Sequence, residues 1–461
     1  MRKPSDLFFY TFLALIVLGL LLQLFYFAIR IKYWEIFPDE YEHYLRSNFY
    51  LKEFMFFISD GPQTYTYGSL RTNPFLYHFL FGNAMRVVDP LNLSQASVLL
   101  YLRFLNLLLA LVKYYYAYLT IKLLTEDRAI KLLVMVLLTN LIMYVSLSVA
   151  ISYDNLVNTM AVISFYYLLK MVNTQSEEVL QFRLSVTLFL LASLVGTLTK
   201  MTYLPLLAIQ LVILCFFYRK LMLSFKAVLT SFKPIKIKTH EYVIAVAIII
   251  LLILNGGIYL RNLILYHSPL PTCGKVLGEQ ICRDFSGMYL RDYTLKEQNK
   301  KTPVMSFGEY LGSYFEQTLG SIVGIHAHKT LSRNSSECAK EIWIITLAIL
   351  LLLFFNFKEC FSNPVFNTLF FSSLAYMSVV LFHNYATYLE VRLFGIGLQG
   401  RYNFPIIVNL IIVLVYGALS GLHRFWWIKW VKWPIVFYVS YVFIRGGFYY
   451  FNKHVDPSWF N

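Results

Sequence analysis

Apolar runs long enough to cross a lipid bilayer recur along this chain of 461 residues, and they constrain its fold more than any other feature. A transmembrane helix needs about 20 predominantly apolar residues to cross the hydrocarbon core. Inside that core the backbone must satisfy its own hydrogen bonds, which favours helices. Runs of this length predict an all-α polytopic membrane protein with about eleven transmembrane helices.

The expected spans follow one another in alternating directions. They are Leu7–Ile29, Val98–Leu119, a segment ending near Val149, a segment ending near Lys170, a segment ending near Thr199, Pro205–Tyr218, Tyr242–Tyr259, Ile342–Phe357, Pro364–Tyr385, Phe404–Leu422 and Pro434–Tyr450. No internal repeat or linker tract interrupts them. We therefore expect residues 1–461 to form a single transmembrane domain.

Two long loops separate these spans, and both are predicted on the outer side of the membrane. The first covers residues 30–97 and the second residues 261–340. Within the first, Phe75–Val88 is apolar but too short to span, which favours an interfacial helix. Within the second, Cys273 and Cys282 could form a local disulfide if the loop is extracytoplasmic.

The charged residues support this topology. Only 14% of the residues are charged, whereas a soluble domain has about a quarter. Lys and Arg concentrate in short loops, above all Arg219–Lys238, and Met1-Arg2-Lys3 precedes the first span. The positive-inside rule then predicts a cytoplasmic N-terminus. The expected location is the plasma (inner) membrane. The net charge of +15 therefore reflects membrane topology and does not indicate a nucleic-acid partner.

An acidic stretch, Phe37–Arg46, directly follows the first span. Pro38 ends the preceding helix and can begin a new one. In that new helix Asp39 and His43 would lie one turn apart on a shared face, with Glu40 in the first turn. A solvated, capped helix beside the membrane would explain these residues equally well.

Several further ionisable residues fall on the same predicted side. Asp154 and Lys200 occupy very short outer turns, and Glu390, Arg392 and Arg401 lie in the outer loop before the tenth span. Charges near membrane depth are costly unless they are paired or line a wet cavity. Taken one at a time, Lys200 could snorkel and Arg401 could anchor the interface. Together they indicate one cavity that opens outward.

The chemistry of such a cavity can be inferred from its residue types. A carboxylate at a helix start can act as a general base on a hydroxyl or an amine. Lys and Arg can hold a lipid phosphate, and arginine can bind two of its oxygens. This combination suits transfer from a lipid-phosphate donor. The sequence has no metal-ligand spacing and no phosphate-binding glycine loop, so we expect no cofactor and no nucleotide-sugar donor.

Short motifs in this order resemble a bacterial family of GT-C-like membrane proteins, known chiefly as a domain of unknown function and often linked to cell-surface polysaccharide. The motifs are Pro38-Asp39-Glu40-x-x-His43, Asn73-Pro74-x-x-Tyr77, Tyr153-Asp154-Asn155-Leu156, Lys200-x-x-Tyr203-x-Pro205 and Gln399-Gly400-Arg401-Tyr402-x-x-Pro405. The resemblance implies a GT-C-like fold and a glycosyltransferase with a polyprenyl-phosphate sugar donor. It also implies inversion at the anomeric carbon.

By the same resemblance, the motif residues take expected roles. Asp39 and Glu40 are the expected catalytic acids, and Lys200 and Arg401 the expected ligands of the donor phosphate. Residues expected to support the site or bind the acceptor are His43, Asp154, Tyr203 and Gln399. The chain departs from the family pattern at Tyr41-Glu42, where a small residue and alanine are expected. The second outer loop carries no family motif.

Membrane lipids and a glycan, lipid or protein acceptor complete the expected partners. Two other functions remain open at the level of sequence. A transporter or flippase of a lipid-linked or anionic solute would use the same cations without a general base. A scaffold subunit would use the acids structurally. Transporters usually carry internal repeats and interrupted helices, which this sequence does not display.

Overall fold

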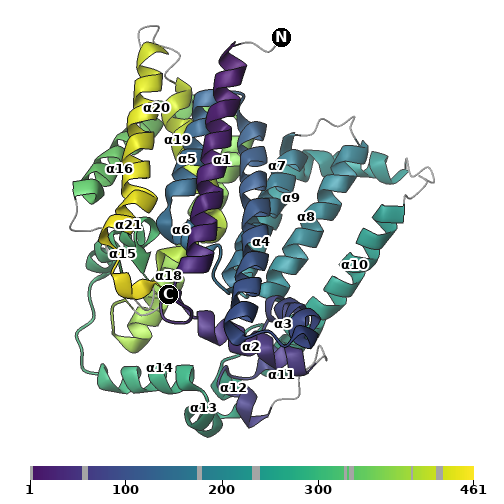
Figure 1. The fold of residues 1–461 in the computed structure, drawn as a ribbon. Coiled ribbons are helices and arrows are strands. Elements are labelled where there is room, and N and C mark those ends of the chain that lie inside the picture. Colours follow the sequence, from purple (N-terminus) through teal and green to yellow (C-terminus); the bar gives the residue numbers. More distant parts are fainter. Residues whose placement is uncertain are drawn as a thin grey trace.

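A computed structural model describes residues 4–53, 61–173, 179–230, 239–326, 330–331, 337–395, 398–421 and 429–460. Long helices lie roughly side by side in a bundle, and shorter helices gather at one end of it (Figure 1). The described residues include one short antiparallel hairpin, β1 (Ile325–His326) with β2 (Thr330–Leu331). Residues 54–60 of the first expected outer loop, and 327–329 and 332–336 of the second, lie outside the described residues.

The bundle is built from long apolar helices. They are α1 (Pro4–Arg30), α4 (Gln95–Leu124), α7 (Tyr153–Asn173), α8 (Val179–Thr199), α9 (Tyr203–Thr230), α10 (Thr239–Asn255), α16 (Glu337–Phe355), α18 (Pro364–Val391), α19 (Phe404–Leu419) and α20 (Lys429–Ile444). Seven helices among the described residues are long and apolar enough to cross a membrane. An all-helical polytopic membrane protein is confirmed, while the count of about eleven spans stays a prediction.

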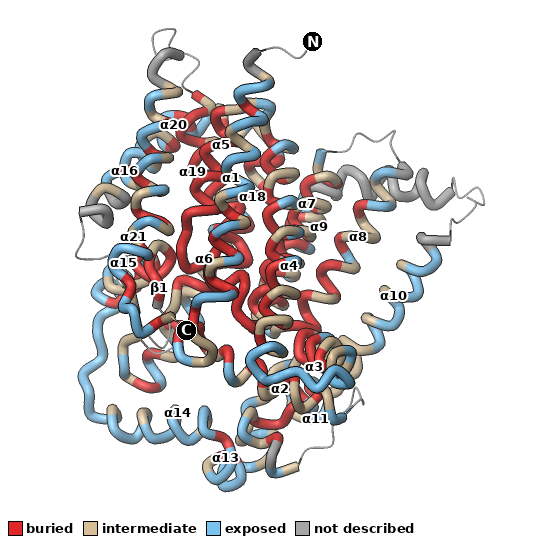
Figure 2. The backbone as a smooth tube through the Cα atoms, viewed as in Figure 1, coloured by how far each residue is buried: buried red, intermediate tan, exposed pale blue. Residues whose placement is uncertain are grey.

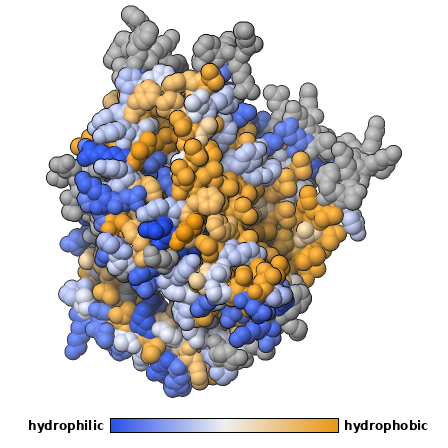
Figure 3. All heavy atoms as spheres, viewed as in Figure 1, coloured by the Kyte–Doolittle hydropathy of each residue, from blue (hydrophilic) through white to orange (hydrophobic). Residues whose placement is uncertain are grey.

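The surface of the bundle is apolar where a membrane would contact it. Along α1 and α4 apolar side chains are exposed, among them Leu18, Leu22 and Leu108. Figure 3 shows hydrophobic residues gathered across the middle of one face, with hydrophilic residues frequent toward its lower end. A water-soluble protein would not leave so much apolar surface uncovered, so this band fits contact with lipid.

The third expected span is two helices, α5 (Arg128–Asn140) and α6 (Ile142–Leu147). They meet at Leu141, whose backbone is extended with ψ of 96°. Asn140 Nδ2 donates to the Val136 carbonyl at 2.8 Å. Asn side chains that bond to nearby backbone compete with the helical ladder, which accounts for a break at this point. Every described residue of α5 after Arg128 is buried, which places α5 at the centre of the bundle (Figure 2).

Both expected outer loops fold into short helices at the end of the bundle opposite the N-terminus (Figure 1). In the first loop these are α2 (Glu40–Lys52), η1 (Pro62–Thr64), η2 (Leu70–Thr72), α3 (Leu76–Val88) and η3 (Asp89–Leu91). The second loop contains α11 (Arg261–Tyr266), α12 (Cys273–Leu277), α13 (Glu279–Phe285), α14 (Gly287–Gln298) and α15 (Phe307–Val323). The remaining short elements are η4 (Gly256–Leu260), α17 (Phe357–Cys360), η5 (Gly400–Asn403), η8 (Arg445–Tyr449), α21 (Tyr450–His454) and η9 (Pro457–Trp459).

Helix α3 crosses α2 at close range because Gly82 has no side chain. A Cβ atom at this position would lie 2.5 Å from the Ser47 carbonyl oxygen. The crossing buries Tyr77, Phe81 and Met85 on one face of α3. The expected helix at Phe75–Val88 is thus confirmed, and its place at the membrane surface stays a prediction.

The two outer loops are joined to one another. Asn262 Nδ2 donates to the Thr72 carbonyl of the first loop at 3.0 Å and to the Pro269 carbonyl of the second at 3.1 Å. Cys273 and Cys282 form the expected disulfide within the second loop. These contacts hold the loops together as one cap over this end of the bundle.

Candidate functional site

The candidate site lies at the end of the bundle that the outer loops cover. The N-terminal ends of four helices, α2, α7, α9 and α19, meet there. Asp39 immediately precedes α2, and its backbone is left-handed with φ of 59°. Its carboxylate therefore does not cap α2, and Oδ2 accepts a hydrogen bond of 2.8 Å from Arg401 Nη2. The expectation that Asp39 and His43 share a helix face is wrong, because Asp39 lies outside the helix with a non-helical backbone.

Arg401 is held by η5, the turn before α19. Gly400 N donates to Ser321 Oγ of α15 at 2.7 Å, and a Cβ atom on Gly400 would lie within 2.7 Å of Ser321 and Ile322. This tight packing requires glycine and leaves only 8% of the Arg401 side chain exposed. Arg401 Nε is buried and has no hydrogen-bond partner among the described residues.

A second ion pair lies beside the first. Lys200, in the turn between α8 and α9, donates to Asp154 Oδ1 at 2.6 Å from the first turn of α7. Lys200 Nζ also lies 4.4 Å from the centre of the Tyr153 ring and 5.6 Å from that of Tyr402, the neighbour of Arg401. Burial alone would lower the pKa of Lys200, but the Asp154 carboxylate and nearby rings raise it. The ion pair with Asp154 therefore favours the charged form of Lys200.

Two histidines lie beneath these ion pairs. His43 Nδ1 and His78 Nε2 are 3.0 Å apart, and both rings are buried. The edge of Tyr153 packs on His43, with 4.3 Å between ring centres. Burial lowers the pKa of both imidazoles, and nearby cations, including Arg46, lower them further. Burial thus favours the neutral form of both rings, in which one ring can donate its N–H to the other.

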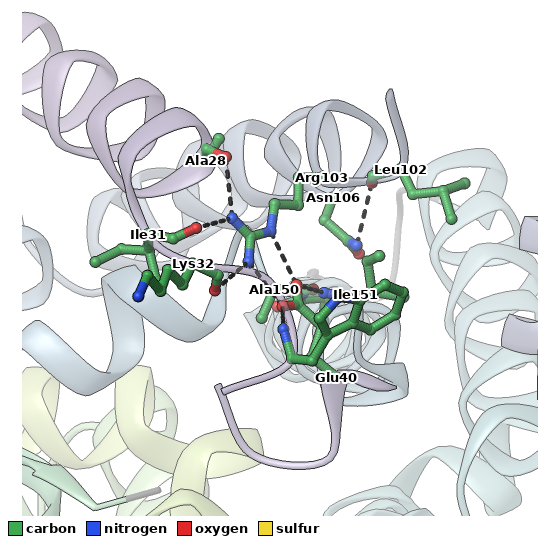
Figure 4. A network of polar contacts seen from close by, with 11 residues as sticks. Ala28, Ile31, Lys32, Glu40, Leu102, Arg103, Asn106, Ala150 and Ile151 are labelled. Atoms are coloured by element: carbon green, nitrogen blue, oxygen red, sulfur yellow. Dashed lines mark hydrogen bonds and ion pairs between the residues drawn. The ribbon is translucent and has the colours of Figure 1, made fainter. Parts of the chain in front are cut away.

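Glu40 turns away from this cluster. It forms a fully buried ion pair with Arg103 of α4, whose Nε and Nη2 donate to the two carboxylate oxygens at 2.9 and 2.7 Å (Figure 4). Arg103 also donates to the carbonyls of Ala28, Ile31 and Lys32 at the end of α1. The expected catalytic role of Glu40 does not fit a carboxylate that is sealed from solvent and doubly paired.

Glu40 instead joins the chain segments that carry the site. Its Oε1 accepts from Ile151 N at 3.1 Å, three residues before Asp154, and its Oε2 accepts from Trp34 N at 3.3 Å (Figure 4 shows the Ile151 contact). The same carboxylate therefore anchors the turn before Asp39 and the turn before α7. A buried carboxylate whose two oxygens both accept hydrogen bonds can hold the segments that donate to it in fixed positions.

The other expected residues are placed differently. The Tyr203 hydroxyl donates to Ser164 Oγ at 2.7 Å within the buried packing between α7 and α9. Tyr203 thus packs between these helices, and the expectation that it supports the site or binds the acceptor stays a prediction. Gln399 precedes η5, and its Oε1 is buried without a hydrogen-bond partner among the described residues. Gln399 remains beside Arg401, as expected.

An apolar cavity of about 410 Å³ adjoins η5. Its walls come from α5, α15, α16, α18 and α19, and they are almost entirely aliphatic and aromatic. Asn403, two residues after Arg401, also lines it. Cavities of this size can hold part of a small molecule or a lipid chain. The element η5 thus carries both the Arg401 partner of Asp39 and a residue that lines the apolar cavity.

Two residues of this site were not identified from the sequence. Arg103 lies within the expected span Val98–Leu119, and a charge within a transmembrane helix is itself a signal of a paired or functional residue. His78 directly follows the Asn73-Pro74-x-x-Tyr77 motif, but no local pattern indicated that it would contact His43, which is 35 residues away. Among the described residues, no cluster of three His, Cys, Asp or Glu side chains is placed to hold a metal ion.

No protein-family profile matches the chain, and no curated protein matches it. Solved structures that resemble it include ArnT from Cupriavidus metallidurans in the apo state, at 13% identity and a TM-score of 0.45 over 94% of this chain and 64% of that one. Another is the archaeal oligosaccharyltransferase AglB from Archaeoglobus fulgidus, in complex with an inhibitory peptide and a dolichol-phosphate. It has 12% identity and a TM-score of 0.49, over 94% of this chain and 55% of that one.

A further structure of the Archaeoglobus fulgidus oligosaccharyltransferase, in complex with Zn and sulfate, is 12% identical with a TM-score of 0.46, over 93% of this chain and 52% of that one. All three are GT-C superfamily glycosyltransferases, the superfamily that the sequence motifs resemble. The chain spans between about half and two thirds of the length of these proteins. Likeness at this level carries no argument about activity, which has to come from the site.

Proposed function

We propose that this protein is a membrane glycosyltransferase of the GT-C type. It moves a sugar from a polyprenyl-phosphate donor to a glycan, lipid or protein acceptor at the extracytoplasmic face of a plasma (inner) membrane, and its N-terminus is cytoplasmic. The observation that carries this proposal is the pairing of Asp39 with Arg401 beside the pairing of Asp154 with Lys200. One accessible carboxylate and two buried cations at a helix-bundle end are the groups that such a transfer needs.

In the proposed reaction Asp39 is the general base. It accepts the proton of an acceptor hydroxyl or amine as the acceptor atom forms its bond to the anomeric carbon of the sugar. The bond from that carbon to the phosphate oxygen breaks, and the phosphate leaves with the electron pair. Lys200 and Arg401 stabilise the negative charge that develops on the leaving phosphate. Attack opposite the leaving group inverts the anomeric carbon.

The cavity beside η5 supports a lipid-linked donor over a water-soluble one. Its walls are apolar, and Asn403 brings it within two residues of Arg401. An isoprenoid chain in this cavity would leave its phosphate near the cations. A nucleotide sugar would bury polar groups against apolar walls at considerable cost.

The experiment that tests the proposal compares the wild type with Asp39→Asn in reconstituted membranes. Each is supplied with a panel of polyprenyl-phosphate sugars and an acceptor extract, and the release of free polyprenyl phosphate is measured. Release by the wild type and not by a folded Asp39→Asn variant is expected. No release from any donor, together with movement of the lipid across the bilayer, would instead favour a flippase.

A further inference from the structure

The ion pair of Asp39 with Arg401 joins the proposed base directly to a proposed ligand of the donor phosphate. Oδ2 of Asp39 lies 2.8 Å from Nη2 of Arg401. In this arrangement the carboxylate oxygen accepts the hydrogen bond that Arg401 Nη2 could otherwise donate to a phosphate oxygen. The two partners of Arg401, the carboxylate and the phosphate, therefore compete for the same donor.

Arg401 has a second donor that the carboxylate does not use. Its Nε is buried without a hydrogen-bond partner among the described residues, and the whole side chain is more than nine-tenths buried. Adjacent guanidinium N–H groups match two oxygens of one phosphate. A phosphate can therefore satisfy both Nε and the terminal nitrogen, whereas Asp39 satisfies the terminal nitrogen alone.

The two acidic partners of the site differ in how firmly they are held. Asp154 and Lys200 are both largely buried, at 8% and 11% side-chain exposure, and Asp154 belongs to the first turn of α7. The Asp39 side chain is 47% exposed and precedes α2. Ion pairs that reach solvent contribute little stability, so Asp39 can leave Arg401 at a small cost.

We propose that Asp39 takes the place of the donor phosphate on Arg401 in the substrate-free protein, and that donor binding releases Asp39 to act as the base. This inference rests on the proposed function and adds to it the order in which the two substrates bind. The donor binds first, and the base becomes available to the acceptor only when a phosphate occupies Arg401. The phosphate prevails because its two free oxygens can accept from both Nε and Nη2 of Arg401, whereas the Asp39 carboxylate accepts from Nη2 alone.

This exchange has a consequence that a simple structural ion pair lacks. Removing the Asp39 charge should abolish transfer and, at the same time, tighten the binding of the donor phosphate. The expected gain is about fivefold in affinity, the scale of a partly exposed ion pair. A purely structural role for the pair would make binding weaker in the variant, because Arg401 would lose its position.

The test uses the purified full chain in lipid nanodiscs, titrated with farnesyl phosphate as a short isoprenyl phosphate. Dissociation constants are measured for the wild type, Asp39→Asn, Asp39→Ala and Glu390→Gln. Glu390 is the matched control, because its exposed carboxylate pairs with Lys296 away from Arg401. Tighter binding in both Asp39 variants, with wild-type affinity in Glu390→Gln, is expected. Melting temperatures establish that each variant is folded.

Two further ligands identify what drives the exchange. Farnesol lacks the phosphate, and an equal gain in affinity for farnesol would overturn the inference. Inorganic phosphate lacks the lipid, and a gain for inorganic phosphate as well would support an exchange driven by the headgroup alone. A lack of gain for inorganic phosphate beside a gain for farnesyl phosphate would support an exchange that requires the lipid-linked form.

The remaining outcomes separate this inference from the function on which it rests. If the wild type binds farnesyl phosphate and the Asp39 variants bind it no more tightly, the exchange is wrong and the proposed function stands. If no variant binds it, both are wrong.

Discussion

Glu40 and Arg103 are both fully buried and are joined through both carboxylate oxygens, although 63 residues separate them in the chain. The two neighbouring acids thus have different roles. The Asp39 carboxylate lies in the candidate site, whereas the Glu40 carboxylate links buried chain segments in the interior. This division of roles between adjacent residues leads to the first prediction.

Glu40→Gln should destabilise the protein. The change would leave the Arg103 guanidinium buried without its counter-charge, which typically costs about 3–5 kcal/mol. Unfolding in mild detergent, followed by thermal or denaturant titration, measures the loss. Glu390→Gln serves as the control, because that carboxylate is exposed. A Glu40→Gln variant with wild-type stability and no transfer activity would indicate instead that Glu40 is a catalytic residue.

Arg401→Lys should lower turnover strongly although it keeps the positive charge. A lysine offers a point charge and cannot bind two phosphate oxygens in the plane of a guanidinium. Loss of one such donor to a developing anion typically lowers kcat by about 10²–10³-fold. Release of polyprenyl phosphate in reconstituted membranes measures the effect. Arg291→Lys is the matched control, because Arg291 is exposed and pairs with Asp292 in α14. Equal turnover in both variants would remove Arg401 from the donor site.

Stability should fall as the pH drops below about 6.5, the ordinary histidine value in an unfolded chain. Burial lowers the pKa of His43 and His78 in the folded protein, so the unfolded chain takes up protons first. The stabilisation is fully present above pH 6.5 and is lost as the pH falls toward the lowered folded values, at up to about 1.4 kcal/mol per pH unit for each histidine. Unfolding midpoints between pH 7.5 and 5 measure this slope.

His78→Gln provides the matching variant, since glutamine can still hydrogen-bond to His43 but does not titrate. Its stability should depend less steeply on pH than that of the wild type. His454→Gln is the control, because His454 is exposed near the C-terminus. Identical slopes for the wild type and His78→Gln would exclude the histidine pair as the source.

Removing the disulfide should loosen the cap and leave the bundle intact. The bond between Cys273 and Cys282 closes a short loop across α12 and α13, and such closures contribute about 2–3 kcal/mol to local order. Cys273→Ser with Cys282→Ser should speed tryptic cleavage near Lys275 and Arg283. Cys215→Ser is the control, because Cys215 is an unbonded cysteine. Cleavage at the wild-type rate in the double variant would contradict this prediction.

The predicted orientation can be tested by labelling single cysteines in intact cells. Lys301→Cys, in the second outer loop, should react with a membrane-impermeant thiol reagent in a background in which Cys215, Cys338 and Cys360 are replaced by Ser. Lys122→Cys, at the opposite end of α4, should react only after the membrane is opened. Both positions are exposed, so accessibility to solvent does not distinguish them. The reverse pattern would place the candidate site in the cytoplasm.

Much of the helical framework could be predicted because hydropathy is a local property. The spans around α1, α4 and α18 appear in the sequence as long apolar runs, and their length alone implies a helix in lipid. The break between α5 and α6 was missed, since it depends on how one asparagine side chain bonds to the backbone. The contact of Tyr203 with Ser164 could not be predicted, because a motif gives a position in the chain and not the direction of a side chain.

The sequence by itself determined that the chain is a helical membrane protein, because apolar run length needs no knowledge of neighbours. It also grouped Asp39, Asp154, Lys200 and Arg401 on one side, through the alternation of the spans. Only the tertiary structure decided which of these residues meet. Asp39 and Arg401 are 362 residues apart, and their contact depends on a left-handed backbone at Asp39 and on the packing of Gly400 against α15. Pairing at such a distance arises from packing, which no local pattern encodes.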